Sequence, residues 1–248
     1  MTKRVVITGM GVITPVGNSI DETWQALLEG KNGIGKITAF DVSQYDTKIA
    51  GEIKNFDASS FMDKKEVRRT PKFIQYALKT AKEAIEMAGL ENASIDKDRV
   101  AVLIGSGIGG LNVMEEQQTI LMQKGASRVS PFLIPMLIPN MAGAFVSMKY
   151  GYRGPNFCIV TACATGTHSI GEALKLLQRG DADVAVAGGT EGALTPLGLA
   201  GFCSAKSLSI RNDAPELASR PFDRDRDGFV MADGAGVMIL ETLEHAQK

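Results

Sequence analysis

The sequence predicts an α/β protein in which a sheet is layered with helices. Short apolar runs rich in β-branched residues, typical of buried strands, alternate with segments whose apolar residues recur at helical spacing. The 248 residues are 44% hydrophobic and 22% charged, which is enough apolar material for a sizeable core. Alternation of strands and helices favours parallel strand pairing. Because no charge run, low-complexity tract or clear repeat interrupts the pattern, we expect residues 1–248 to form one domain.

Five apolar runs are predicted to be strands. The first is a β-branched run that ends at Gly9, where the chain is expected to turn. The second ends in the same way at Gly105. The predicted strands cover residues 5–8, 99–104, 156–161, 183–187 and 237–240.

Capping signals place the helices between these runs. Ser19 and Glu22 have the spacing of a capping box in front of a short helix. Thr70 and Pro71 form a suitable N-cap and first-turn pair for the clearest amphipathic helix, which is expected to stop at Gly89. Three prolines make residues 130–139 irregular, and further helices are predicted over 111–123, 140–150 and 169–179.

The end of the chain and its composition bound the class of protein. Residues 242–248 resemble the beginning of a helix, so we expect a fragment of a longer protein. A formal charge of -1 argues against nucleic-acid binding and against a polybasic membrane binder. No apolar run reaches the roughly 20 residues of a membrane span, and the apolar run near the N-terminus is too short for a signal peptide. Three cysteines without metal-ligand spacing indicate free thiols in a reducing compartment, the cytoplasm.

A glycine-rich segment after the second predicted strand allows a cofactor hypothesis. Residues 105–110, Gly-Ser-Gly-Ile-Gly-Gly, follow a strand and open a helix, as in dinucleotide-binding folds. Such folds also place an acidic residue about 20 positions further on, to bind the ribose. That region of this sequence has no acid, so a structural turn is the preferred interpretation. An NAD-dependent oxidoreductase that uses Gly105–Gly110 remains an alternative.

Cys163 has the strongest chemical context. It lies in Thr161-Ala-Cys-Ala-Thr-Gly166, between a predicted strand and an apolar-faced helix. Small neighbours permit the sharp turn of a nucleophile elbow, which raises the side chain at a helix N-terminus. There the helix dipole favours thiolate over thiol, and free amides can bind a developing oxyanion. Cys158 and Cys203 have no such context and are interpreted as small core residues.

The elbow resembles that of the β-ketoacyl-acyl-carrier-protein synthases, the condensing enzymes of fatty-acid synthesis, and most closely their elongating synthase II type. Other motifs agree in order and spacing over the whole chain. They are Val5-Val-Ile-Thr-Gly-Met-Gly-Val-Ile-Thr-Pro-Val-Gly17, Ile104-Gly-Ser-Gly-Ile-Gly-Gly110, Asn140-Met-Ala-Gly143, Tyr150-Gly-Tyr-Arg-Gly-Pro155, Asp181-Ala-Asp-Val-Ala-Val-Ala-Gly-Gly189, and Ser219-Arg-Pro-Phe-Asp223 through Asp227-Gly-Phe-Val230. The resemblance implies a thiolase-like helix/sheet/helix fold, of which the chain would be the N-terminal half.

The resemblance also implies a reaction. Cys163 would accept an acyl chain as a thioester, and its backbone N–H would form half of an oxyanion hole. Decarboxylation of malonyl carrier protein would then supply the carbanion that attacks the thioester, giving a 3-oxoacyl carrier protein and carbon dioxide. No cofactor is implied, because the substrates arrive on the phosphopantetheine of acyl carrier protein. A homodimer is expected.

Two groups of residues match functional positions of the family. Residues that would line the acyl pocket are Ile108, Leu133, Gly198, Phe202 and Phe229, and Leu133 departs from the aromatic residue that is common in the family. Residues that would dock the acidic carrier protein are Lys65, Arg68, Arg69 and Lys206, the first three on one helical face.

The histidines do not match the family. Its catalytic set contains two histidines and a lysine from the second half of the fold, which would lie beyond Lys248. His168 lies about 140° around the helix from Cys163, and His245 follows the last strand; neither matches a catalytic position. We therefore expect this chain alone to be unable to catalyse condensation. A non-catalytic relative is the other alternative, although such relatives lack the nucleophile.

Overall fold

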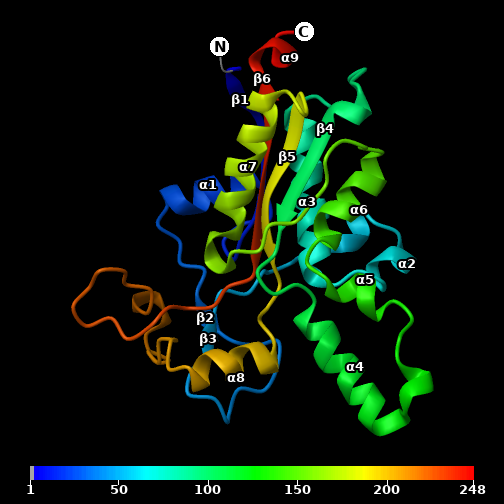
Figure 1. The fold of residues 1–248 in the computed structure, drawn as a ribbon. Coiled ribbons are helices and arrows are strands. Elements are labelled where there is room, and N and C mark those ends of the chain that lie inside the picture. Colours follow the sequence, from blue (N-terminus) through cyan, green and yellow to red (C-terminus); the bar gives the residue numbers. More distant parts are fainter. Residues whose placement is uncertain (1–2) are drawn as a thin grey trace.

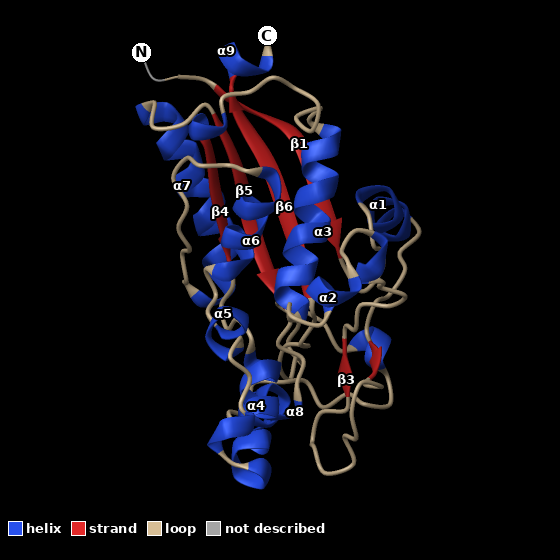
Figure 2. Ribbon diagram, turned by 90° about the vertical axis from the view of Figure 1, so that its right-hand side faces the viewer, coloured by secondary structure: helices blue, strands red, loops and turns tan. Residues whose placement is uncertain are grey.

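A computed structural model describes residues 3–248 and shows a four-stranded sheet with helices on both faces (Figures 1 and 2). The strands of this sheet are β1 (Val5–Ile13), β4 (Val100–Gly105), β5 (Val184–Glu191) and β6 (Gly234–Thr242). A separate pair consists of β2 (Gly35–Lys36) and β3 (Ile49–Ala50). The α-helices are α1 (Ile20–Leu28), α2 (Lys64–Val67), α3 (Lys72–Met87), α4 (Leu111–Lys124), α5 (Leu133–Leu137), α6 (Met141–Tyr150), α7 (Thr165–Arg179), α8 (Pro196–Ser204) and α9 (Leu243–Ala246).

The order of the sheet is β1-β6-β5-β4, and only β4 and β5 are parallel. β6 is antiparallel to both of its neighbours, so the expectation of parallel pairing throughout is wrong. Residues 192–233 explain the difference, because they lie beyond the carboxyl end of β5 and carry no helix back across the sheet (Figure 1). The chain therefore enters β6 from the end at which it left β5, which requires antiparallel pairing.

Alternate residues of the central strands pack on opposite helical layers. Val102 and Ile104 of β4 face α3 and α6, where Phe73 is almost completely buried. Ala101 and Leu103 face α7 on the other side. Since both faces are covered, every residue of β4 is buried, as expected for a strand within an α/β layered sheet.

Two sequence predictions need local correction. Residues 156–161 form no regular strand; only a bridge between Asn156 and Val102 joins them to β4. Phe157 and Val160 on this segment stay exposed, and the described residues supply no second neighbouring strand. Thr70 is not the N-cap of α3: its hydroxyl donates to the Glu66 carbonyl at 2.9 Å, and the extended Pro71 occupies the cap position.

The turn predicted at Gly9 is also wrong: β1 passes through Gly9 and continues to Ile13, with only an irregularity of register between Ile7 and Gly9. The other predicted elements agree with the observed ones to within about four residues. The Ser19 side chain accepts from the Glu22 amide at 3.2 Å, as the capping motif requires, while the Glu22 carboxylate accepts from the Asn18 amide instead. The irregular segment 130–139 contains the short helix α5. Thr242 caps α9.

A second region extends beyond the carboxyl ends of β4 and β5. It contains α4, α5, α8 and the β2–β3 pair (Figures 1 and 2). Its own small core joins Leu199 of α8 to Ile37, Ala50, Leu208 and Met231. The junction between this region and the sheet places loops from several strands around one cavity.

Candidate active site

Cys163 lies on a tight turn that opens directly into α7. Ala162 has a φ of 51°, a conformation that non-glycine residues adopt at a cost and usually at functional sites. The Thr165 hydroxyl accepts from the Thr161 amide at 2.9 Å and closes the turn. The Cys163 side chain is exposed at the N-terminal end of the helix. Among the described residues its own N–H finds no acceptor, so this amide is available to an oxyanion.

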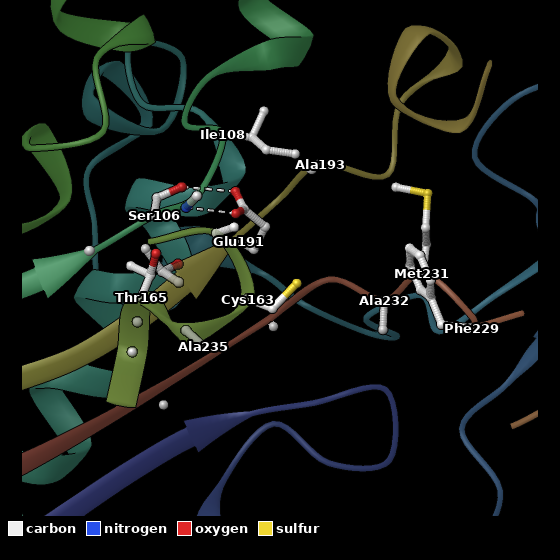
Figure 3. A pocket seen from close by; sticks show the side chains of 18 of the residues that line it. Ser106, Ile108, Cys163, Thr165, Glu191, Ala193, Phe229, Met231, Ala232 and Ala235 are labelled. Carbon is white, nitrogen blue, oxygen red and sulfur yellow. Dashed lines mark hydrogen bonds between the residues drawn. The ribbon is translucent and has the colours of Figure 1, made fainter. Parts of the chain in front are cut away.

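The thiol faces a cavity of about 610 Å³ (Figure 3). Four segments line it: the turn after β4, the elbow, the end of β5 and residues 229–236, with a contribution from α8. Most of the lining is apolar, and the ring centroids of Phe202 and Phe229 lie 5.3 Å apart in an edge-to-face arrangement. Such a cavity is suited to a hydrophobic chain whose reactive end reaches Cys163.

Glycines let the segments around Cys163 approach each other closely. A side chain on Gly105 would meet the Ile159 carbonyl oxygen at 2.5 Å. One on Gly189 would meet the Cα of Gly166 in α7 at 2.9 Å. The elbow therefore packs directly against the carboxyl ends of β4 and β5.

The structure brings together three of the five predicted pocket residues. Ile108, Phe202 and Phe229 line the cavity with Cys163. Leu133, at the start of α5, and Gly198, in the first turn of α8, do not. Gly198 is buried, and a side chain there would meet the Ala193 carbonyl oxygen at 2.4 Å. The functions assigned to all five residues remain predictions.

Three of the predicted docking residues cluster on the surface. Lys65 lies in the single-turn helix α2, and Arg68 and Arg69 follow it, all exposed. Lys65 and Arg69 border a second cavity of about 330 Å³, and the Arg69 guanidinium lies 4.5 Å from the centre of the Phe132 ring. Lys206 is exposed on a different element, just after α8, with a φ of 52°.

The sequence analysis missed two carboxylates: the partly buried Glu191, which lines the cavity, and the buried Asp233, whose two chain neighbours line it. Glu191, the last residue of β5, lines the cavity beside Cys163, and burial raises the pKa of its carboxyl group. Asp233 is 4% exposed and accepts from the Leu194 amide at 3.0 Å; burial raises its pKa as well. The sequence did contain a signal for Glu191: it is a single acidic residue at the carboxyl end of an apolar strand, where the active-site residues of α/β proteins gather.

Neither histidine reaches the thiol. His168 is exposed on α7. His245 lies beyond the C-terminal end of β6, where its Nδ1 hydrogen-bonds the Glu241 carboxylate, while the cavity lies at the opposite end of that strand, beside Ala235. The described residues thus supply no histidine to act as a base for Cys163.

The glycine turn is packed against protein rather than open to a dinucleotide. The Gly110 amide donates to the Leu137 carbonyl at 2.9 Å, and the Gly107 amide donates to Glu191 at 2.8 Å. A dinucleotide-binding turn would present these amides to a pyrophosphate. This arrangement disfavours the oxidoreductase alternative.

Comparison with known proteins identifies the family. Residues 2–246 match the family described as "Beta-ketoacyl synthase, N-terminal domain". The chain belongs to the β-ketoacyl synthase family.

Two curated relatives of this β-ketoacyl synthase chain are both called 3-oxoacyl-[acyl-carrier-protein] synthase 2. The Synechocystis protein is 54% identical over 98% of this chain and 59% of its own length. The Staphylococcus aureus protein is 53% identical over 99% of this chain and 59% of its own length. The chain thus spans about three fifths of these relatives.

Solved structures confirm the thiolase-like ketosynthase fold expected from the resemblance. A β-ketoacyl synthase from Burkholderia phymatum superposes with a TM-score of 0.87 at 31% identity, over 99% of this chain and 60% of that one. A structure described as a type II polyketide-synthase acyl-carrier protein in complex with its ketosynthase gives 0.87 at 30% identity, over 100% and 60%. No helix among residues 3–248 is long and apolar enough to cross a membrane.

Proposed function

We propose that this β-ketoacyl synthase chain carries the acyl-accepting nucleophile of a condensing enzyme of fatty-acid elongation. The observation that carries the proposal is the Cys163 thiol at the N-terminal end of α7, beside an apolar cavity of about 610 Å³. The names of the curated relatives support the assignment to chain elongation. The presence of Cys163 argues against a non-catalytic relative.

In the proposed reaction Cys163 attacks the carbonyl carbon of an acyl thioester on acyl carrier protein. The carrier thiol leaves, and the acyl chain stays on Sγ while the Cys163 N–H binds the developing oxyanion. Malonyl carrier protein then loses carbon dioxide, and the resulting carbanion attacks the acyl thioester and expels the Cys163 thiolate. The product is a 3-oxoacyl carrier protein, and no resident cofactor takes part.

The first test is the intact mass of the protein after incubation with a fatty-acyl carrier protein. We expect the mass to increase by that of one acyl chain, and the increase to be absent from Cys163→Ala. Ser207→Ala, which removes another small polar side chain outside the cavity lining, serves as the matched control and keeps the adduct. An adduct that persists in Cys163→Ala would assign the nucleophile elsewhere. With malonyl carrier protein added, the 248-residue chain is expected to give no product, since no described histidine lies at Cys163.

Acyl carrier protein is the proposed partner. The solved complex of a related ketosynthase with its acyl-carrier protein supports this choice. The exposed cluster of Lys65, Arg68 and Arg69 offers positive charge to an acidic surface in a chain whose formal charge is only -1.

Free cysteines support a cytoplasmic location. A homodimer is proposed from the family, and the exposed Phe157 and Val160 on the open edge beside β4 are consistent with it.

Charge reversal tests the docking surface. Arg68→Glu with Arg69→Glu is expected to weaken carrier binding by about tenfold or more at low salt, with the difference shrinking as salt rises. Lys175→Glu with Arg179→Glu makes the same charge change on exposed positions in the last two turns of α7, away from the elbow, and should bind normally. Binding constants at several salt concentrations decide the matter. Equal weakening in both double variants would show that only net charge matters.

A further inference from the structure

Glu191 makes a hydrogen-bond network inside the cavity that the proposed reaction does not use (Figure 3). Its Oε1 accepts from the Ser106 hydroxyl at 2.8 Å, and its Oε2 accepts from the Gly107 amide at 2.8 Å. The Ser106 oxygen in turn accepts from the Gly109 amide at 2.9 Å. The carboxylate thus holds the start of the turn formed by residues 106–109 directly, and it reaches the Gly109 end only through the Ser106 hydroxyl.

The sheet register explains how Glu191 reaches that turn. β4 and β5 are parallel, and Gly105 pairs with Gly189, so both strands end at the same edge. Glu191 lies two residues beyond the last pair between β4 and β5, where it still pairs with Gly234 of β6, and its side chain reaches the chain that leaves β4. A side chain added to Gly107 would lie 3.0 Å from Glu191 Oε2 and 3.6 Å from the Ala162 carbonyl oxygen. The turn is therefore enclosed between the carboxylate and the elbow that carries Cys163.

The carboxylate binds backbone and hydroxyl groups rather than a cation. No ion pair of Glu191 exists within the described residues, and burial raises the pKa of its carboxyl group while the Ser106 and Gly107 donors lower it. A partly buried carboxylate without these donors would carry an uncompensated cost for lost hydration. The donors of the turn therefore offset part of the cost of burying this carboxylate.

The turn also carries Ile108, whose side chain points into the cavity near Cys163 and is 37% exposed (Figure 3). We propose that Glu191 is a positioning residue that fixes the 106–109 turn against the Cys163 elbow, so that Ile108 occupies one place in the cavity and limits which acyl chains fit there. The part that concerns acyl chains rests on the proposed function. The part that concerns the turn does not.

Three variants and one control, all made in the full-length protein, test the positioning role of Glu191. Glu191→Ala removes both hydrogen bonds to the carboxylate and leaves the bond between Ser106 and Gly109. Glu191→Gln keeps both the size of the side chain and its two hydrogen bonds, because the amide oxygen can accept from the Gly107 amide while the amide nitrogen donates to the Ser106 hydroxyl. Ser106→Ala removes only the hydroxyl and serves if Glu191→Ala does not fold. Glu83→Ala is the matched control, because Glu83 also accepts from two backbone amides, those of Val12 and Ile20, but lies outside the cavity lining.

The first readout is amide hydrogen exchange of a peptide that contains residues 106–110. We expect exchange about tenfold faster in Glu191→Ala, because the Gly107 amide loses its acceptor and the Ser106 hydroxyl loses the group that anchors it. Ser106→Ala removes the acceptor of the Gly109 amide instead and should give a smaller increase, because Gly107 keeps its hydrogen bond. Glu191→Gln and Glu83→Ala should match the unaltered protein. Unchanged exchange in Glu191→Ala would overturn the positioning role whether or not the protein transfers acyl chains.

The second readout is kcat/KM for transfer from short-chain and long-chain acyl carrier proteins. Glu191→Ala is expected to change the ratio of the two values by about fivefold or more, whereas Glu191→Gln retains the original ratio. A general loss of stability would lower both values equally and overturn the assignment to chain selection. If Glu191→Gln lost transfer as completely as Glu191→Ala while its exchange stayed normal, Glu191 would be a proton-transfer group and the proposal would be wrong. An unaltered protein that transferred no acyl chain would remove the proposed function but leave the exchange result standing.

Discussion

Gly105→Ala is expected to lower the free energy of unfolding by about 3 kcal/mol or more and to slow the reaction of Cys163 with an acyl donor. The added methyl would lie 2.4 Å from Cγ2 of Thr165 and 2.5 Å from the Ile159 carbonyl oxygen. Neither neighbour can yield freely, because one is backbone and the other begins α7 and is buried. Relief of the clash requires the elbow to move away from β4, and that movement displaces Cys163.

Urea denaturation followed by circular dichroism measures the stability, and the rate of the acyl adduct by intact mass measures the site. Gly236→Ala is the matched control: Gly236 lines the same cavity, but an added methyl has no neighbour within 4 Å. Its stability should stay within about 0.5 kcal/mol of the unaltered protein. If Gly105→Ala were as stable as Gly236→Ala, the close approach of the elbow to β4 would be wrong.

Phe73→Ala is expected to lower the free energy of unfolding by about 3–5 kcal/mol. Phe73 is 1% exposed and belongs to the core between the sheet and the helices α3 and α6. Truncation removes the ring from the interior and leaves a cavity in a close-packed region. The effect arises from the packing of α3 rather than from the site.

Phe222→Ala removes the same ring from a position that is 98% exposed. It should change the free energy of unfolding by less than about 0.5 kcal/mol in the same denaturation experiment. Equal losses in the two variants would contradict the assignment of Phe73 to the core. Because Phe222 has a φ of 64°, Phe222→Gly is a further variant that should be neutral or stabilising.

The sequence was sufficient where a signal is local. Five residues around Cys163 are small or hydroxylated enough to form the elbow, and the helix after them begins at Thr165. The amphipathic pattern that ends at Gly89 likewise predicted α3, and the structure places its last helical residue at Met87. Local capping chemistry and apolar spacing determine such elements before any long-range contact forms.

The direction of β6, and whether residues 156–161 form a strand at all, depended on the neighbouring segments of the fold. β6 is antiparallel to β5 because the chain enters β6 at the edge of the sheet where β5 ends. The alternation of strands and helices in the sequence does not predict the path of the chain between two strands. Residues 156–161 have the composition of a strand, yet they have a neighbour on one side only and stay irregular. A strand's hydrogen bonds are supplied by other segments, so composition alone cannot decide whether it forms.

The sequence by itself determined the family and the α/β layering and singled out Cys163 as the proposed nucleophile, because each depends on residue types at fixed local spacing. The tertiary structure alone decided which residues share the cavity. It brought Ile108, Phe202 and Phe229 to Cys163, left Leu133 and Gly198 outside the lining, and placed Glu191 beside the 106–109 turn. These residues are separated by up to 121 positions and meet only because two parallel strands end at the same edge of the sheet.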